Sequence, residues 1–423
     1  MLKLRFTETI RADLVKGSIH IMASNSLTSL LSFVLFFLIA RFCGPAELGI
    51  FSIFYSVLMI VSNFFDQGIS LVTIHFYNRY REMREEILKV IFKIRLFIIF
   101  LICCFLFLSA RFLASDIFGK PELAASFRNA SFAIFFGTFI YFTLSVFRAK
   151  EMYREFALFK FIYLAFASIG GIIMISRGVK NTDLIMHLYS AGAIVSFAAS
   201  FGRIGWGFIF ARVRNRHLMR EFVEFGKWIV LSAVCFSLSR NMLLFLVGKF
   251  ASLEELGRFS LAYQIINGIS VLFSSLTVVL FSHSSRIETL AGIKRFISKS
   301  AKFMVVIAIM TMAVLAAALS PAIKIIFGKQ YEGVSKIALI LFIGQGIFII
   351  SFPLKSAIVN YFKDVKGICF IDILLFILII ALCPFLLRHF GTAGGAAGYS
   401  ASLFISYLIG RYILFKSLAR RLN

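Results

Sequence analysis

Basic side chains lie where the sequence is otherwise apolar, and they are the residues best suited to bind an anion. Arg240 stands eight residues before Gly248 and twelve after Trp228, which puts it roughly 12 and 18 Å from the two ends of that apolar run if the run is helical. A guanidinium at such depth is costly unless water, a counter-ion or an anionic ligand stabilises it. Arginine also grips phosphate by paired hydrogen bonds. Arg240 is therefore the first candidate for an anion site.

Nine further Lys or Arg side chains fall within apolar runs. Arg95, Arg203 and Lys355 lie about two turns inside such runs, a depth at which either a wet cavity or snorkelling to the headgroups accounts for them. We include these three with Arg240 in a predicted cationic site. The others lie near the ends of their runs and are expected to snorkel: Lys89, Lys93, Arg128, Lys160, Lys324 and Arg411.

Neutral polar residues recur in the same runs. A helix facing only lipid gains nothing from them, so they indicate either hydrogen bonds between helices or a wet cavity. Four of them follow one another at helical spacing along one stripe, namely Gln264, Asn267, Ser270 and Ser274. The predicted polar lining of a cavity consists of Asn25, Ser29, Asn241, Gln264 and Asn267.

Only two acids, Asp66 and Asp372, lie inside the apolar runs. Asp66 has three possible roles: it neutralises a buried cation, binds a coupling ion, or caps a helix break at Gly68. We favour the first role.

The histidines and the six cysteines show no metal-ligand spacing, and no Ser-His-Asp or paired-carboxylate arrangement can be inferred. No metal or cofactor is therefore expected.

The amino-acid composition indicates which secondary structure the apolar runs form. Hydrophobic residues make up 60% of the 423 residues and charged residues 15%, against about 25% charged in soluble domains. Hydrocarbon cannot pair with exposed amides, so the runs must be helices. We therefore predict an all-α polytopic membrane protein of about twelve spans. They cover residues 18–40, 48–76, 88–110, 125–147, 156–176, 184–210, 228–247, 259–281, 303–327, 337–361, 368–387 and 393–415.

The net charge of +25 reports membrane orientation rather than nucleic-acid binding, because Lys and Arg resist translocation. With the N-terminus inside, the cytoplasmic segments carry 25 Lys and Arg and the external ones carry 10. The first run is too long for a secretory signal, so we interpret it as a retained helix. Both termini are thus predicted to be cytoplasmic. The basic segments also suit anionic lipid headgroups.

Two segments of the chain repeat. Residues 37–52 (FLIARFCGPAELGIFS) and 245–260 (FLVGKFASLEELGRFS) agree at half of their positions, and IFGK occurs at both 117–120 and 326–329. The offset is close to half the chain, which predicts two six-helix lobes, 1–216 and 217–423. Because six is even, both lobes enter from the same side, as in a parallel repeat. Such a repeat favours a cleft that opens alternately to each side of the membrane.

Four motifs resemble those of bacterial polysaccharide-unit flippases, within the multidrug, oligosaccharidyl-lipid and polysaccharide exporter (MOP) superfamily. They occur in the family's order along the chain: ARFCGPAELGIFS (40–52), FDQGIS (65–70), PAIKIIFGKQYEGVSKIALIL (321–341) and HFGTAGGAAGYSAS (389–402). The resemblance covers the whole chain and implies a MATE-like fold in the bacterial inner membrane.

The resemblance further implies that the chain is not an enzyme but translocates an undecaprenyl-pyrophosphate-linked oligosaccharide unit for O-antigen or lipopolysaccharide assembly, through a cationic cavity between two lobes. The implied partners are this lipid-linked cargo, membrane lipids and polymerase or assembly proteins, with Na⁺ or H⁺ as the coupling ion. One departure is that residues 240–248 (RNMLLFLVG) contain no acid where many relatives have one. This departure puts ion coupling by that helix in doubt.

Three other functions compete with this interpretation. A cation-coupled multidrug exporter of the same superfamily would prefer an acidic cavity. A membrane-embedded polymerase or transferase would require a sizeable loop with catalytic groups, whereas the longest connection here runs only from Ser282 to Lys302. A non-transporting assembly partner would leave Arg240 without a purpose beyond packing.

Overall fold

The computed structural model describes the backbone of residues 2–211 and 217–419, and side chains from His20 onward except for Gln67 and a few within α9, α10 and α13. This described part contains helices and no strands. The predicted all-α membrane fold is confirmed.

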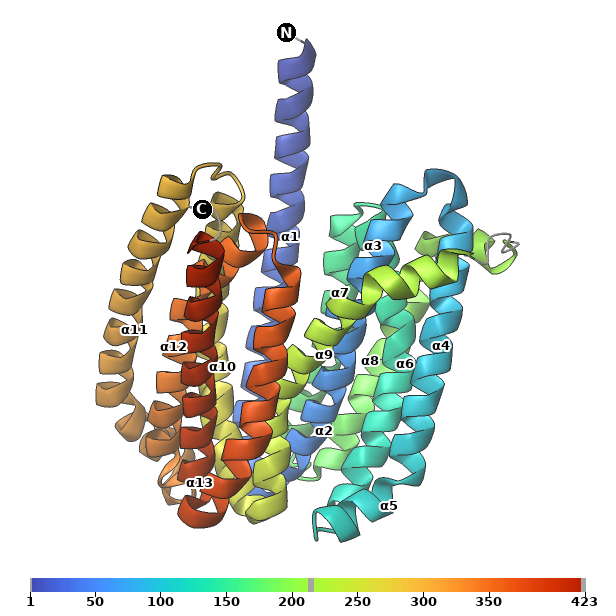
Figure 1. Cartoon of the computed structure of the whole chain (residues 1–423). Coiled ribbons are helices and arrows are strands. Elements are labelled where there is room, and N and C mark those ends of the chain that lie inside the picture. The colour runs from blue at the N-terminus through green and yellow to red at the C-terminus, as the bar shows by residue number, and fades with distance from the viewer. Residues whose placement is uncertain (1, 212–216, 420–423) are drawn as a thin grey trace. The chain divides into compact units, whose positions relative to one another are not determined.

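The α-helices alternate with short connections along the chain (Figure 1). Their bounds are α1 Leu2–Leu38, α2 Pro45–Asn63, α3 Ser70–Arg79, α4 Arg84–Leu108, α5 Ala110–Phe112, α6 Leu123–Ala149, α7 Tyr153–Ser176, α8 Thr182–Ile204, α9 His217–Phe250, α10 Leu253–Ser284, α11 Leu290–Phe327, α12 Val334–Asn360 and α13 Val365–Ala419.

Ten stretches of the described residues are long and apolar enough to span a membrane. One of them, 366–416, holds 51 residues, about twice the length of one crossing. It is interrupted at Gly391, whose φ is 59°, so it accounts for the two predicted spans 368–387 and 393–415. The predicted span 184–210 was too long, because α8 ends at Ile204 and Gly205 follows with a φ of 72°.

Within the described residues, three π-helical turns interrupt or extend the α-helices: Ile39–Cys43, Phe64–Ile69 and Leu113–Ile117. The second joins α2 to α3 and contains Asp66 and Gly68. The helix break considered at Gly68 is therefore a π-turn, in which each amide pairs five residues back.

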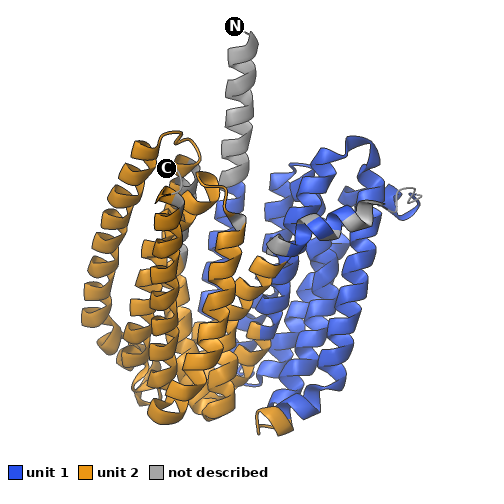
Figure 2. Ribbon diagram, viewed as in Figure 1, with its two compact units in different colours: residues 1–35, 57–114, 122–230 blue, residues 36–56, 115–121, 231–423 orange. Residues whose placement is uncertain are grey.

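Packing divides the chain into two compact units (Figure 2). Unit 1 comprises residues 1–35, 57–114 and 122–230, and unit 2 comprises residues 36–56, 115–121 and 231–423. These units are not the two halves of the sequence repeat, because residues 36–56 and 115–121 precede residue 217 yet pack in unit 2. Three helices, α1, α2 and α9, each contribute to both units.

Within unit 1, α6 packs against α4 and α8, and α8 also packs against α7. The start of α9 belongs here too, since the Tyr80 hydroxyl donates to both carboxylate oxygens of Glu221 at 2.7 Å. This hydrogen bond raises the pKa of Tyr80. Within unit 2, α12 is the central helix, with α10, α11 and α13 around it.

Candidate functional site

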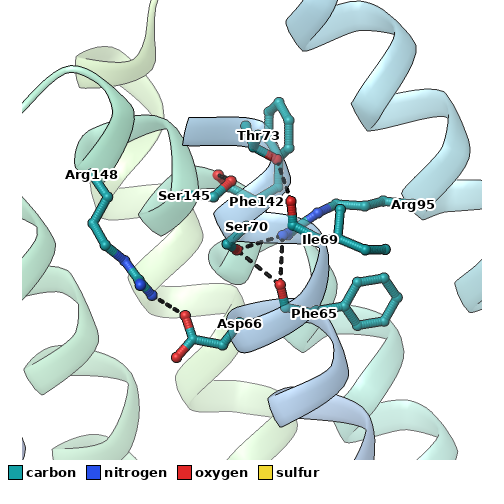
Figure 3. Close-up of polar contacts among 9 residues, drawn as sticks. All are labelled: Phe65, Asp66, Ile69, Ser70, Thr73, Arg95, Phe142, Ser145 and Arg148. Carbon is teal, nitrogen blue, oxygen red and sulfur yellow. Dashed lines mark hydrogen bonds and ion pairs between the residues drawn. The ribbon is translucent and has the colours of Figure 1, made fainter. Parts of the chain in front are cut away.

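In unit 1 the predicted site residue Arg95 lies on α4 and is fully buried. Its Nη2 donates to the carbonyl oxygen of Phe65 at 3.1 Å and to the hydroxyl of Ser70 at 2.8 Å (Figure 3). The guanidinium also stacks 5.3 Å from the centre of the Phe65 ring. Arg95 is thus directed at the π-turn between α2 and α3.

The π-turn explains why the Phe65 carbonyl oxygen accepts so many donors. In the longer π-helical ring it accepts the backbone N–H of Ser70, and the Ser70 hydroxyl donates to it as well, at 2.9 Å. Arg95 then supplies a third donor from another helix. The guanidinium therefore holds the segment that carries Asp66.

Two nitrogens of Arg95, Nε and Nη1, have no hydrogen-bond partner among the described residues. Beside it, Asp66 of the π-turn pairs with Arg148 of α6 (Figure 3). Lys160 on α7 lies close by, because its ammonium and the Arg148 guanidinium are 5.6 and 4.7 Å from the centre of the same Phe156 ring. Three cations therefore share one carboxylate.

Sequence reasoning missed two members of this cluster. Arg148 was counted with the connection after its span, and Lys160 was expected to snorkel. Arg203, which the sequence analysis assigned to the same cationic site as Arg95, lies elsewhere in unit 1, at the end of α8. Its side chain is 65% exposed and sits 3.7 Å from Glu155, which makes it a surface residue.

In unit 2, Arg240 lies in the middle of the membrane-spanning part of α9 and is half-buried. Its Nη2 donates to Oδ1 of Asn267 on α10 at 3.1 Å, so two predicted site residues meet. The Tyr263 hydroxyl donates to the Arg240 carbonyl oxygen. No carboxylate pairs with the guanidinium among the described residues.

Two other predicted polar residues lie near this pair in the sequence. Gln264 is half-buried one turn before Asn267 and has no hydrogen-bond partner among the described residues, whereas the Asn241 amide donates to the Ser237 carbonyl of its own helix at 2.9 Å. The side chain of Ser274 lies outside the described residues.

Lys355 on α12 has a carboxylate partner, unlike Arg240. Its Nζ is 3.3 Å from Oδ1 of Asp372 on α13, and the Ser232 hydroxyl donates to the other oxygen at 2.8 Å. The side chains of Lys355 and Asp372 are 19% and 6% exposed. The structure therefore pairs Lys355 with an acid.

Some polar residues of α1 are buried against another helix, and others are exposed. Ser24 is buried and donates to the carbonyl oxygen of Ala157 on α7 at 2.8 Å, a helix-to-helix hydrogen bond. Ser29 is half-buried and Asn25 is exposed. Among the side chains that the structure describes, no three His, Cys, Asp or Glu residues gather as metal ligands would.

Solved transporters share this fold. A lipid II flippase, MurJ, in an inward closed conformation matches with a TM-score of 0.77 over 96% of this chain and 89% of that one, at 14% identity. An inward-facing multidrug resistance MATE transporter of the MOP superfamily matches with a TM-score of 0.71 over 96% and 98%, at 13% identity. A MOP superfamily transporter from Pyrococcus furiosus, described as having a binding pocket of reverse polarity, matches with a TM-score of 0.63 over 96% and 95%, at 13% identity.

Comparison at the level of sequence identifies the family to which the chain belongs. No curated protein sequence matches the chain. A family model described as "Polysaccharide biosynthesis protein" matches residues 38–336, which is more than half of the chain and includes residues 38–52 and 245–260 of the repeated segments. The chain is therefore a member of this polysaccharide biosynthesis protein family and a multi-pass membrane protein with the transporter fold of the MOP superfamily.

Proposed function

We propose that the chain is a flippase that moves an undecaprenyl-pyrophosphate-linked oligosaccharide repeat unit across the cytoplasmic membrane by alternating access. The observation that carries this proposal is Arg240, a cation in the middle of a span whose guanidinium, among the residues that the structure describes, donates a hydrogen bond to the neutral amide of Asn267 and pairs with no carboxylate. A cation without a counter-ion in the membrane requires water or an anion.

A pyrophosphate suits the N–H donors of Arg240 that the hydrogen bond to Asn267 does not use. Arginine has five N–H donors in a fixed fork, and the hydrogen bond to Asn267 uses one of them. The remaining donors can hold a phosphoryl group by paired hydrogen bonds. The amide of Gln264, which has no partner among the described residues, lies one turn along α10 and suits a sugar hydroxyl.

The charge of unit 1 also favours an anionic cargo. Arg95, Arg148 and Lys160 share the single carboxylate of Asp66, so the cluster carries an excess of two positive charges. Asp66 is held by Arg148, and we assign it to charge balance rather than to ion coupling.

A multidrug exporter that takes cationic compounds requires a free carboxylate in its cavity. Both acids that the sequence places within spans are already held, Asp66 by Arg148 and Asp372 by Lys355 and Ser232. This arrangement disfavours the exporter and favours the polysaccharide pathway that the family description indicates.

The test uses the host in which the gene is deleted. We expect an undecaprenyl-pyrophosphate repeat unit to accumulate, as measured by mass spectrometry of extracted lipids, while surface polysaccharide is lost. Wild type should reverse both effects and Arg240→Ala should not, at equal protein abundance. Arg411→Ala, which removes an exposed cation from α13, is the matched control and should behave as wild type.

Each alternative gives a different result. Unchanged lipid intermediates together with increased drug sensitivity would support the exporter, and incomplete repeat units would point to an enzyme. Full activity of Arg240→Ala would remove Arg240 from the site. Activity retained in Arg240→Lys would indicate a point charge rather than a bidentate grip.

We also propose that both termini are cytoplasmic, from the excess of Lys and Arg on that side of the predicted topology. Single cysteines placed at residues 212–216 should then resist a membrane-impermeant thiol reagent in intact cells. Labelling of these positions from outside would reverse the orientation.

A further inference from the structure

Three phenylalanine rings form a row in unit 2 beside Arg240. The ring of Phe236 on α9 stacks on that of Phe348 on α12, with 6.2 Å between centroids and 27° between ring planes. Phe348 in turn makes an edge contact with Phe352, one turn further along α12, at 5.8 Å between centroids. These three residues are called the aromatic row below, and all of them belong to one compact unit.

Helical spacing places a cation at each end of the aromatic row. Arg240 follows Phe236 by four residues on α9, and Lys355 follows Phe352 by three on α12. Residues at such spacing are neighbours on one helix face. The guanidinium carbon of Arg240 lies 5.9 Å from the centre of the Phe236 ring, and Lys355 Nζ lies 5.5 Å from the centre of the Phe348 ring. The rings and the two cations therefore form one continuous stripe across α9 and α12.

Only one of these two cations is available to an anion. Lys355 is paired with Asp372, whereas the guanidinium of Arg240 has no carboxylate partner in the part of the chain that the structure describes. A phosphoryl group therefore binds at the Arg240 end of the stripe. The group joined to that phosphoryl then lies along the rings, towards Lys355.

The rings keep part of their surface uncovered. All three members of the aromatic row are half-buried, whereas Phe303 and Phe385 of the same unit are exposed. The row is thus neither closed core nor fully open surface. Such partial cover is what a ligand that stacks on ring faces requires.

The far end of the row is polar. Asp372 accepts hydrogen bonds from Lys355 and from the Ser232 hydroxyl there, and Phe348 and Lys355 line a small pocket whose wall also includes the hydroxyl-bearing Tyr407. A ligand that follows the row from Arg240 therefore meets ring faces first and polar groups afterwards.

We propose that the aromatic row is a carbohydrate subsite, which stacks the sugar ring next to the pyrophosphate of the cargo. This inference rests on the proposed function. A pyranose ring carries C–H groups on one face and hydroxyl groups around its rim. The C–H groups pack on the negative face of an aromatic ring, and the hydroxyl groups pair with the polar residues beyond it. Eight residues separate Ser232 from Arg240, about 12 Å along α9, which leaves room for a sugar ring between the ion pair and the phosphate.

The same stripe suits the prenyl chain of the cargo less well. A hydrocarbon chain laid along the rings would reach the ion pair of Lys355 and Asp372 and exclude water from it, which carries a desolvation cost. It would also leave the hydroxyl and amide groups around the row without partners. The row therefore selects cargo whose first sugar presents a C–H face.

Two lipids test the subsite on the full-length protein in lipid nanodiscs. One is undecaprenyl pyrophosphate, which has no sugar, and the other is the lipid-linked unit extracted from the deletion host. Native mass spectrometry gives the dissociation constant of each. We expect Phe236→Leu and Phe348→Leu to weaken binding of the sugar-bearing lipid by about 2- to 10-fold, the range for an aromatic stack, and to leave binding of the sugar-free lipid unchanged. Phe236→Tyr keeps the ring face and should bind both lipids as wild type does.

Two further variants separate the phosphate contact from the sugar contact. Arg240→Ala removes the phosphate contact and should weaken both lipids by the same factor. Phe303→Leu, which replaces an exposed ring on α11, is the matched control and should change neither affinity. Wild type alone provides a test that needs no variant to assemble, because it should bind the sugar-bearing lipid more tightly than the sugar-free one.

The outcomes distinguish the subsite from the proposed function. Equal loss of both lipids in the leucine variants would show that the rings hold the prenyl chain or the fold, and this would overturn the subsite. Equal affinity of wild type for the two lipids would overturn it as well, while the flippase proposal would stand. If wild type binds neither lipid, the proposed function fails and the subsite fails with it.

Discussion

The ion pair of Lys355 and Asp372 permits a prediction whose size follows from burial. The two side chains are 19% and 6% exposed and 3.3 Å apart. Breaking a fully buried pair costs about 3–5 kcal/mol, because the remaining charge is left without a partner. Lys355→Met should therefore reduce the free energy of unfolding by about 3 kcal/mol, since Asp372 keeps only its hydrogen bond from Ser232. Asp372→Leu should cost less, about 2 kcal/mol, because the more exposed lysine can turn towards water.

The double variant distinguishes pairing from two separate effects. Replacing both charges with apolar residues, Lys355→Met with Asp372→Leu, should leave the stability within about 1 kcal/mol of wild type. The summed costs of the single variants should then exceed the cost of the double variant by about 4 kcal/mol, more than the roughly 0.5–3 kcal/mol usual for residues in contact. Denaturation of the purified protein in detergent measures wild type, the two single variants and the double variant, with Lys324→Met, at an exposed site, as a control without effect.

Two results would refute this reasoning. If the single costs simply add in the double variant, the ion pair contributes nothing to the fold. If the double variant is stable but does not transport, Lys355 belongs to the cargo site that the sequence predicts. A stable and active double variant would instead assign the pair to the folding of unit 2.

Two smaller predictions concern unit 1. Asp66→Asn should cost about 1–2 kcal/mol of stability, between the values for exposed and buried pairs, because its side chain and that of Arg148 are 25% and 20% exposed; a thermal unfolding midpoint equal to that of wild type would contradict this. Gly192→Ala would put a methyl group 2.6 Å from the Tyr163 carbonyl oxygen, so it should lose about 1–3 kcal/mol through overpacking, whereas Gly202→Ala on the same helix, with open space around it, should gain up to about 1 kcal/mol. Equal effects of the two glycine variants in the same unfolding assay would show that close packing of α7 on α8 is not the cause.

The helices were predictable because membrane spans depend on local composition. A run of apolar residues long enough to cross the bilayer has no other way to satisfy its backbone. The π-turn at Phe64–Ile69 was not predictable, although FDQGIS suggested a break. Its geometry depends on Arg95, which donates to the Phe65 carbonyl from a different helix, and no local pattern records that donor.

The site was predicted less well than the fold, for a reason visible in Arg148 and Arg203. Depth along a helix was the only criterion that the sequence offered. It favoured Arg203, because the span was taken to run six residues beyond Ile204, and it passed over Arg148 near the end of α6. Depth also says nothing about which helix faces which. The pairing of Arg148 with Asp66, and of Lys355 with Asp372, depends on packing between helices.

The membership of residues 36–56 and 115–121 in unit 2 affects the order in which the protein can be assembled during synthesis. These residues leave the ribosome with the first half, but Ser52 and Phe118 meet their partners, Ser260 and Phe245, only after the chain has grown well beyond residue 217. Until then an inserted first half presents unmatched glycine and carbonyl surfaces within the bilayer. A nascent chain stalled near residue 216 should therefore be a substrate for membrane quality-control proteases, and supplying the second half as a separate polypeptide should protect it.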